Sequence, residues 1–222
     1  GIRDSSVTGV QTCALPIYDI EGSDKMQILK LLTRLRQLCL EPRLVYDNID
    51  QPSSKLKACM ELIKTMQENK QKVLLFSSFT SVLDLIAEEC QKAGITYYML
   101  TGSTNKEERR ELVSRFQKDD TTVFLISLKA GGTGLNLTSA ENVIHYDPWW
   151  NVSAQNQATD RAYRIGQKNN VQVFNLVMKD SVEEKIIEMQ KRKKELADMF
   201  VENNSGGLSQ MSKEDILSLF TM

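Results

Sequence analysis

The spacing of apolar residues changes along the chain at about residue 70. Two amphipathic helices are predicted ahead of that point, because apolar residues recur there with the spacing i, i+3, i+4, i+7. Pro42 ends the first helix, and Pro52 with two serines opens the second. The apolar positions are Ile28, Leu31, Leu32, Leu35 and Leu38 in the first helix and Leu56, Met60, Ile63 and Met66 in the second.

Short apolar runs of buried-strand type follow, at residues 73–76, 95–100, 122–126, 142–146 and 171–178. Helices are predicted between the early runs, one from about Ser81 to Ala93 that Gly94 ends and one reaching Phe116 that opens with a capping box of Thr104 and Glu107. Strands that alternate with helices predict an α/β fold, in which a parallel sheet has helices on both faces. Ligands bind such sheets outside the carboxyl ends of the strands, so the loops after the first, third and fourth runs are the first places to expect a site.

The C-terminal part of the chain is predicted to be a helical appendage packed beside the sheet. Ser181 and Glu184 form a further capping box, and a short last helix starts at Ser212. A basic run at 191–194 is interpreted as a solvated helix face with intrahelical pairs to nearby glutamates. The apolar positions of the long helix are Val182, Ile186, Met189, Leu196 and Phe200.

The first twenty residues are set apart from the fold. Residues 7–17 read VTGVQTCALPI, which looks like the conceptual translation of a common DNA sequencing adapter and has no signal-peptide pattern. We therefore expect residues 1–20 to be an artefact or a disordered segment and the genuine gene to be interrupted there. An irregular native linker is the alternative.

Composition narrows the class of protein. The 28 basic and 29 acidic residues give a net charge of −1, so any nucleic-acid site must be a local patch. No apolar run approaches the ~20 residues that span a bilayer, so a membrane protein is not expected. The four cysteines are scattered without a CxxC pair, which predicts reduced thiols in a cytoplasmic protein and no metal site.

Three segments carry candidate chemistry. In SAQNQATDRAYRIGQ (153–167), Gln157, Arg161 and Arg164 share one helical face, and guanidinium groups there suit an anionic ligand such as phosphate. The alternative is a surface helix with a pair between Asp160 and Arg164. In ISLKAGGTGLNLTSA (126–140), a glycine-rich turn after a strand, with Lys129 inside it, suits phosphate or backbone contact, although a tight structural loop is the commoner explanation.

The third segment is HYDPWWN (145–151). One of its two adjacent tryptophans is expected in the core and the other partly exposed, where it could serve a partner interface, a nucleic-acid groove or simple packing. His145 alternates with core positions and is interpreted as a satisfied core histidine rather than a catalyst. No GK[ST] loop occurs anywhere in the chain.

Together these segments resemble the C-terminal helicase lobe of the Swi/Snf-type, superfamily 2 DNA-dependent ATPases of bacterial type. The resemblance covers residues 26–190 and includes RLRQLCLEP (34–42), VLLFSSFTSVLDLI (73–86), YYMLTGSTNKEERRELVSRF (97–116), and the glycine-rich and QATDRAYRIGQ segments. It implies a RecA-like lobe at 71–180, lead-in helices at 21–70 and a C-terminal brace at 181–222. Ser78 and Val152 depart from the common family residues, Gln and Pro.

The resemblance also implies roles for individual residues. Arg161 and Arg164 would be catalytic arginine fingers at the phosphates of ATP. The implied ATP-binding residues are Gln157, Gly134, Asn136 and Asp160, and those toward the DNA backbone are Ser77, Ser78, Lys129, Gly131 and Trp150. Magnesium would be held mainly by an N-terminal ATPase lobe that this chain lacks.

The function predicted from the sequence is that of the second motor lobe of an ATP-dependent double-stranded DNA translocase in the bacterial cytoplasm or nucleoid. The chain alone is predicted to be inactive. Two alternatives are a strand-separating DNA or RNA helicase of the same superfamily and a non-catalytic module that binds nucleic acid or a protein partner. A strand-displacement assay separates the first alternative, and an upstream GK[ST] loop and DExH box would exclude the second.

Overall fold

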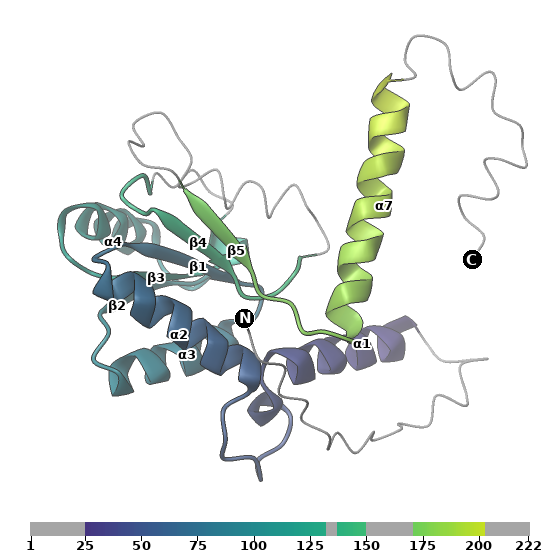
Figure 1. The fold of residues 1–222 in the computed structure, drawn as a ribbon, viewed down its shortest axis with the longest axis horizontal. Helices are drawn as coiled ribbons and strands as arrows, with labels where there is room; N and C mark the ends of the chain where they lie inside the picture. The colour runs from purple at the N-terminus through teal and green to yellow at the C-terminus, as the bar shows by residue number, and fades with distance from the viewer. Residues whose placement is uncertain (1–24, 132–136, 150–170, 203–222) are drawn as a thin grey trace, which may run out of the picture.

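The computed structural model describes residues 25–131, 137–149 and 171–202. Within them, five strands form one parallel sheet in the order β2-β3-β1-β4-β5 (Figure 1). The strands are β1 (Val73–Ser77), β2 (Tyr97–Leu100), β3 (Val123–Ser127), β4 (Asn142–His145) and β5 (Gln172–Asn175). The helices are α1 (Lys25–Leu40), η1 (Pro42–Leu44), α2 (Ser54–Glu68), α3 (Thr80–Lys92), α4 (Lys106–Lys118), α5 (Leu128–Gly131) and α7 (Val182–Glu202). The predicted α/β class is confirmed, although β2 and β5 are shorter than the apolar runs that predicted them.

Successive residues of β1 supply two separate cores, because neighbouring side chains of a strand point to opposite faces of the sheet. Val73 and Leu75 pack on one face in a core that also contains buried residues of α2 and α3. Leu74 and Phe76 pack on the other face, where Phe116 of α4 closes the second core. Helices therefore cover both faces, as the alternation of strands and helices predicts. The helix α2, which lies among the expected lead-in helices, contributes to the first of these cores.

The apolar stripe of α1 behaves differently from that of α2. The four predicted apolar positions of α2 are all buried, whereas Leu31 of α1 is 50% exposed and Ile28 and Leu35 are each 38% exposed. The end of the helix is firmly placed, because Leu40 is buried in the first core and its carbonyl accepts a hydrogen bond from the Tyr146 hydroxyl at 3.1 Å. The stripe therefore predicts the helix correctly, but the described residues cover it only in part, since Leu32 and Leu38 are half-buried.

The start of α4 differs from the predicted capping box. Asn105 is the N-cap, and its side chain accepts a hydrogen bond from the Glu108 amide at 2.9 Å. The Thr104 hydroxyl instead accepts from the Thr101 amide at 3.1 Å and closes the preceding turn. Asparagine and threonine are both good N-caps, and the Thr101–Thr104 turn engages the threonine. The prediction of a Thr104–Glu107 box is wrong by one residue.

The long helix α7 stands away from the sheet, and its first turns lie beside α1 (Figure 1). Its capping box is only partly as predicted, since the Ser181 hydroxyl accepts from the Glu183 amide but Glu184 accepts from the Asp180 amide. Ile186 is buried, whereas Met189 is 59% exposed, so the predicted apolar face is covered at the first of these positions and not at the second. The described helices include none that is both long and apolar enough to cross a membrane.

Candidate functional site at the carboxyl ends of the strands

The parallel pairing of β1 with β4 brings two loops together at one edge of the sheet. Phe76 lies opposite His145, so the residues that follow each strand meet. Asp147, in the loop after β4, accepts hydrogen bonds at one carboxylate oxygen from the Ser77 hydroxyl at 2.8 Å and the Ser78 amide at 3.0 Å. Its second oxygen accepts from the Ser78 hydroxyl. The carboxylate is 2% exposed and joins the two loops.

A guanidinium from outside the sheet balances this buried charge. Nη2 of Arg36, on α1, lies 3.0 Å from the second oxygen of Asp147, and it also donates to the Ser78 hydroxyl at 3.0 Å and to the Pro148 carbonyl at 3.3 Å. The guanidinium also lies 5.0 Å from the centre of the Phe79 ring. A buried charge is tolerated when it is paired and hydrogen-bonded, and both conditions are met here.

The two predicted DNA contacts after β1 are therefore engaged within the protein. Ser77 is fully buried and its hydroxyl points to Asp147, so in this conformation its side chain supports the loop instead of facing outward. Ser78 is half-buried and donates to the same carboxylate. A DNA contact through Ser78 stays a prediction, and the structure offers no surface for one through the Ser77 side chain.

Lys129 lies at the same edge, because β3 is the other neighbour of β1 and Ser127 pairs with Ser77. The chain turns directly after β3 into the single helical turn α5, where the sequence predicts only a glycine-rich loop. Leu128 and Ala130 are buried and Lys129 is exposed, so the turn directs this one charge outward. The Arg109 guanidinium of α4 fixes the turn by donating to the Ala130 carbonyl at 3.2 Å.

Of the other predicted site residues, the structure describes one. Gly131 is the last residue of α5. The remaining ones, which are Gly134, Asn136, Trp150, Gln157, Asp160, Arg161 and Arg164, lie outside the described residues. What the structure does show is that the loops after β1, β3 and β4 share one edge, and two of these loops lead directly into the segments that carry those residues.

A second buried ion pair attaches α7 to the lobe. The Lys55 ammonium of α2 lies 2.7 Å from both carboxylate oxygens of Glu183, and Glu183 also accepts from the Met178 amide at 2.8 Å. The ammonium also lies 5.2 Å from the centre of the Tyr146 ring. Burial lowers the pKa of Lys55, and the carboxylate of Glu183 opposes that shift. The pair fixes where α7 begins.

Neither buried ion pair was found from the sequence. Arg36 and Asp147 lie in the segments 34–42 and 145–151, but the sequence assigns neither a functional role. Nothing in the sequence around Lys55 or Glu183 indicates an ion pair. The partners are separated by 111 and 128 residues, so only the order of strands and helices in space reveals them. The one usable signal is Asp147 itself, an acidic residue two positions after the end of the buried strand β4.

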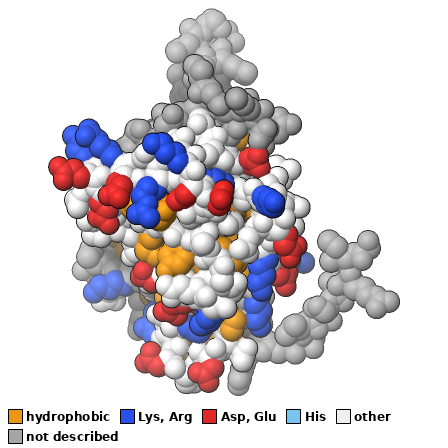
Figure 2. Space-filling view, turned by 90° about the vertical axis from the view of Figure 1, so that its left-hand side faces the viewer, with side chains coloured by type: hydrophobic (Ala, Val, Ile, Leu, Met, Phe, Trp, Pro, Cys, Tyr) orange, Lys and Arg blue, Asp and Glu red, His pale blue; other side chains and the backbone are white. Residues whose placement is uncertain are grey.

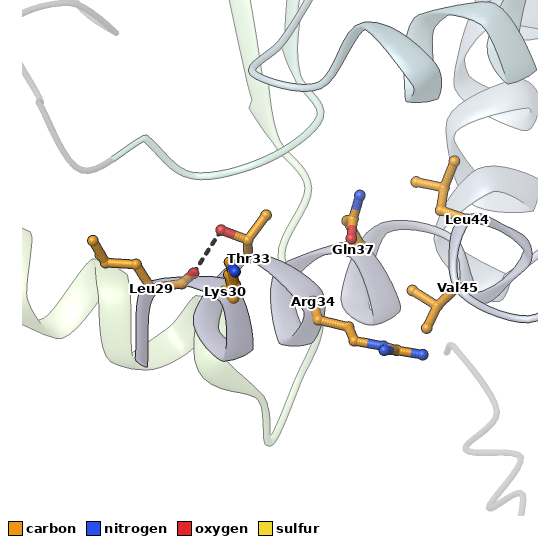
Figure 3. Close-up of a pocket in the computed structure, with 7 residues that line it drawn as sticks. All are labelled: Leu29, Lys30, Thr33, Arg34, Gln37, Leu44 and Val45. Atoms are coloured by element: carbon orange, nitrogen blue, oxygen red, sulfur yellow. Dashed lines mark hydrogen bonds between the residues drawn. The ribbon is translucent and has the colours of Figure 1, made fainter. Parts of the chain in front are cut away.

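Two hollows occur among the described residues, and the smaller one borders the site at Asp147 and Pro148. A groove of about 500 Å³ runs along the outer side of α1 (Figure 3), and it is lined by Leu29, Lys30, Thr33, Arg34, Gln37, Leu44 and Val45. A smaller cavity of about 120 Å³ lies between the ends of β4 and β5 and α7. Burial raises the pKa of the free thiols of Cys59 and Cys90, which keeps them neutral. Among the described residues no cluster of His, Cys, Asp and Glu suits a metal ion.

The surface charge is mixed. On the side of the molecule that carries α4, basic and acidic side chains are interspersed (Figure 2). Within α4 itself, Arg115 pairs with Glu111 at 3.7 Å. A mixed surface agrees with the small net charge and confines any phosphate-binding patch to a local site.

These features define a RecA-like α/β lobe whose loops converge on the carboxyl edge of a parallel sheet, and comparison with known proteins identifies its family. Residues 54–166 match the model of the helicase conserved C-terminal domain, and the chain belongs to that family. It is the C-terminal helicase lobe of a Snf2-type superfamily 2 ATPase.

The relatives extend well beyond this chain. An uncharacterized ATP-dependent helicase of Mycoplasma pneumoniae is 38% identical over 205 residues, which are 92% of this chain and 20% of that protein. The putative ATP-dependent helicase/translocase YwqA of Bacillus subtilis is 37% identical over 98% of this chain and 23% of its own length. The mouse SWI/SNF-related matrix-associated actin-dependent regulator of chromatin subfamily A member 1 is 35% identical over 88% and 20%. The chain thus spans about a fifth of these relatives.

A solved structure supports the same assignment. The C-terminal part of the Fun30 ATPase domain superimposes with a TM-score of 0.60 and is 41% identical, covering 62% of this chain and 45% of that one. At this identity the likeness extends beyond the fold to the sequence itself.

Proposed function

We propose that this chain is the second motor lobe of an ATP-dependent double-stranded DNA translocase. In this proposal Arg161 and Arg164 stabilise charge that develops on the γ-phosphate of ATP bound by a first lobe. The observation that carries the proposal is the meeting of the loops after β1, β3 and β4 at one sheet edge, since the third of these loops leads into the segment with both arginines. Parallel sheets bind ligands at this edge.

In this proposal the two lobes share the contacts to ATP, and the first lobe holds most of the magnesium ligands. Gln157, Gly134, Asn136 and Asp160 of this chain would line the nucleotide side of the cleft. The chain has no GK[ST] loop, so the phosphates and the magnesium ion would be held mainly by the first lobe. The exposed apolar stripe of α1 supports the presence of a partner surface of this kind.

DNA would be held at the same edge through its phosphates. Lys129 is exposed on a turn whose other side chains are buried, which suits a point-charge contact to the backbone. We place Ser78, Gly131 and Trp150 beside it and give Ser77 a supporting role through Asp147. Contacts of this kind carry no sequence information and make binding sensitive to salt. A bacterial cytoplasmic or nucleoid location agrees with the Mycoplasma and Bacillus relatives.

The ATP half of the proposal is tested in the complete two-lobe protein. Arg161→Ala and Arg164→Ala should each lower the DNA-stimulated kcat by about 10³-fold or more, because arginine fingers act on the transition state. DNA affinity should change little. Arg115→Ala, on the exposed side of α4, is the matched control and should leave kcat unchanged. Full turnover in both finger variants would refute the proposed roles.

The DNA half is tested by the salt dependence of binding in the same protein. Lys129→Ala should weaken double-stranded DNA binding and reduce the slope of log K against log salt by roughly 0.9 for the lost phosphate contact. Reversing the four charges at 191–194, which lie on an exposed stretch of α7, should leave affinity nearly unchanged. The opposite pattern would move the DNA path onto α7. A strand-displacement assay with the same protein distinguishes translocation from strand separation.

A further inference from the structure

The network around Asp147 joins three parts of the lobe that are distant in sequence, namely α1, the end of β1 and the loop after β4. The loop after β4 carries Asp147, and its donors come from α1 and from two adjacent residues at the end of β1. Among these groups, Arg36 is the one that is not on a strand or strand loop, and its single Nη2 atom has three acceptors. Neither Arg36 nor Asp147 has been given a role in binding ATP or DNA. Both nevertheless contact Ser78, which the proposed function places toward DNA.

The loop that Arg36 holds is the start of the proposed arginine-finger segment. Asp147 and Pro148 accept from Arg36, and residue 150 begins the segment that contains Arg161 and Arg164. The same guanidinium holds the hydroxyl of Ser78, which we place toward DNA. One buried cation therefore sets the start of the ATP-facing segment and the loop on the DNA side together.

The loop has a second support on its other side. The Gln190 side chain of α7 donates to the Trp149 carbonyl, the next carbonyl along the chain after the one bound by Arg36. The first turns of α7 also lie beside α1 (Figure 1), and each of the two helices supplies one of these hydrogen bonds. A loop fixed by directed hydrogen bonds at successive carbonyls has little freedom to tilt. This matters because reacting groups misplaced by about 1 Å can cost on the order of a hundredfold in rate.

We propose that Arg36 is a positioning residue for ATP hydrolysis, which through Asp147 and Pro148 sets the direction in which the chain leaves β4 and thereby places Arg161 and Arg164. The inference rests on the function proposed above. It assigns to α1 a part in hydrolysis, since any displacement of α1 relative to the sheet moves the guanidinium that holds the loop. A lysine cannot reproduce this arrangement, because its ammonium is a point charge on a flexible stem and lacks the rigid fork of arginine.

The local part of the inference is tested on the chain itself by tryptophan fluorescence. The chain has two tryptophans, Trp149 and Trp150, and both belong to the loop in question. Arg36→Lys should increase acrylamide quenching of their emission. Arg34→Lys is the matched control, because Arg34 lies on the same helix, is exposed and is turned by roughly 200° from Arg36. Equal quenching in the two variants would show that Arg36 does not hold the loop and would overturn the inference.

The functional part is tested in the complete two-lobe protein, measured per folded enzyme. Arg36→Lys should lower kcat by about tenfold or more, as a displaced catalytic group does, while KM for ATP and DNA affinity stay within about twofold. Arg36→Ala should lower kcat further, so that lysine gives partial rescue. A lower melting temperature with unchanged kcat would identify Arg36 as a structural anchor only and overturn the inference.

Measuring Arg161→Ala in the same series distinguishes failure of the positioning role of Arg36 from failure of the proposed arginine-finger role. If it abolishes turnover while Arg36→Lys does not, the positioning role fails and the arginine-finger role stands. If Arg161→Ala leaves turnover intact, the proposed function fails and the positioning role falls with it.

Discussion

His145 is the single histidine of the chain, and it lies at the edge where the candidate site forms. It is 2% exposed and stacks on Phe76 with ring centres 5.7 Å apart. Burial lowers its pKa to about 4, so the ring is neutral at physiological pH. This agrees with the sequence-based interpretation of a core histidine and makes it a poor candidate for acid–base chemistry.

The low pKa of His145 predicts how stability depends on pH. The unfolded chain binds a proton at this ring below about pH 6.5, whereas the folded chain does so only near pH 4. The contribution to stability is therefore complete above about pH 6.5 and is lost as the pH falls toward 4, by roughly 3 kcal/mol in all.

Urea unfolding of the chain and of His145→Gln at several pH values measures this contribution. Carboxylates titrate in both proteins, so the difference between the two isolates the histidine. The difference in unfolding free energy should shrink between pH 6.5 and 4. Two curves that stay parallel would contradict the assigned pKa.

At the scale of single residues, the local environment of His145 could be predicted and the environment of Asp147 could not. The short apolar run along β4 places His145 on a buried strand without further information. The four hydrogen bonds of Asp147 depend on β4 lying beside β1 and on the end of α1 reaching both. No pattern within the segment 142–149 contains that information.

At the scale of elements, most helices and strands can be predicted from the spacing of apolar residues. Where a helix begins or ends depends on which neighbouring side chain makes the capping hydrogen bond. The helix α3 ends where predicted, because Gly94 adopts a φ of +68° that other residues disfavour. The helix α4 begins one residue later than the predicted N-cap implies, because Thr104 is used in a turn. The placement of α7 has a different origin, since a buried ion pair with α2 fixes its first turn.

The Lys55–Glu183 pair should matter most when only one partner is removed. Lys55→Met leaves a buried carboxylate without its cation and should lower the free energy of unfolding by about 3–5 kcal/mol. Lys55→Met combined with Glu183→Gln should recover most of that loss, because the glutamine oxygen can still accept from the Met178 amide. Urea unfolding measures both effects.

The control for this pair is Lys57→Met, because Lys57 lies on the same helix and is exposed. It should change stability by less than about 0.5 kcal/mol. A similar loss in Lys55→Met and Lys57→Met, or a double variant no more stable than the single one, would show that the buried pair does not fasten α7 to the lobe.

At the scale of the whole molecule, the described residues form one five-stranded sheet and leave some apolar helix faces exposed. Both faces of the sheet are covered by helices, so the lobe has the buried cores that an independent fold requires. The apolar stripe of α1 and Met189 of α7 are exposed, and the chain spans about a fifth of its relatives. The sequence predicted the lobe correctly because the sheet is self-contained. It predicted packing of the α1 and α7 faces less well, because what covers them does not lie among the described residues.

The separation of a stable lobe from its proposed nucleotide site leads to a prediction for the chain alone. We expect the purified 222-residue chain to fold and to show no DNA-stimulated ATP hydrolysis. An arginine finger contributes only when another site holds the phosphates and magnesium, and the chain has no GK[ST] loop to do so. Phosphate release should therefore equal background with and without double-stranded DNA, while circular dichroism confirms that the lobe is folded. DNA binding is a separate matter, since the proposed Lys129 contact does not depend on the nucleotide, and weak salt-sensitive binding should persist and be reduced by Lys129→Ala. Turnover above background in the folded chain would overturn the two-lobe division of labour on which the proposed function depends.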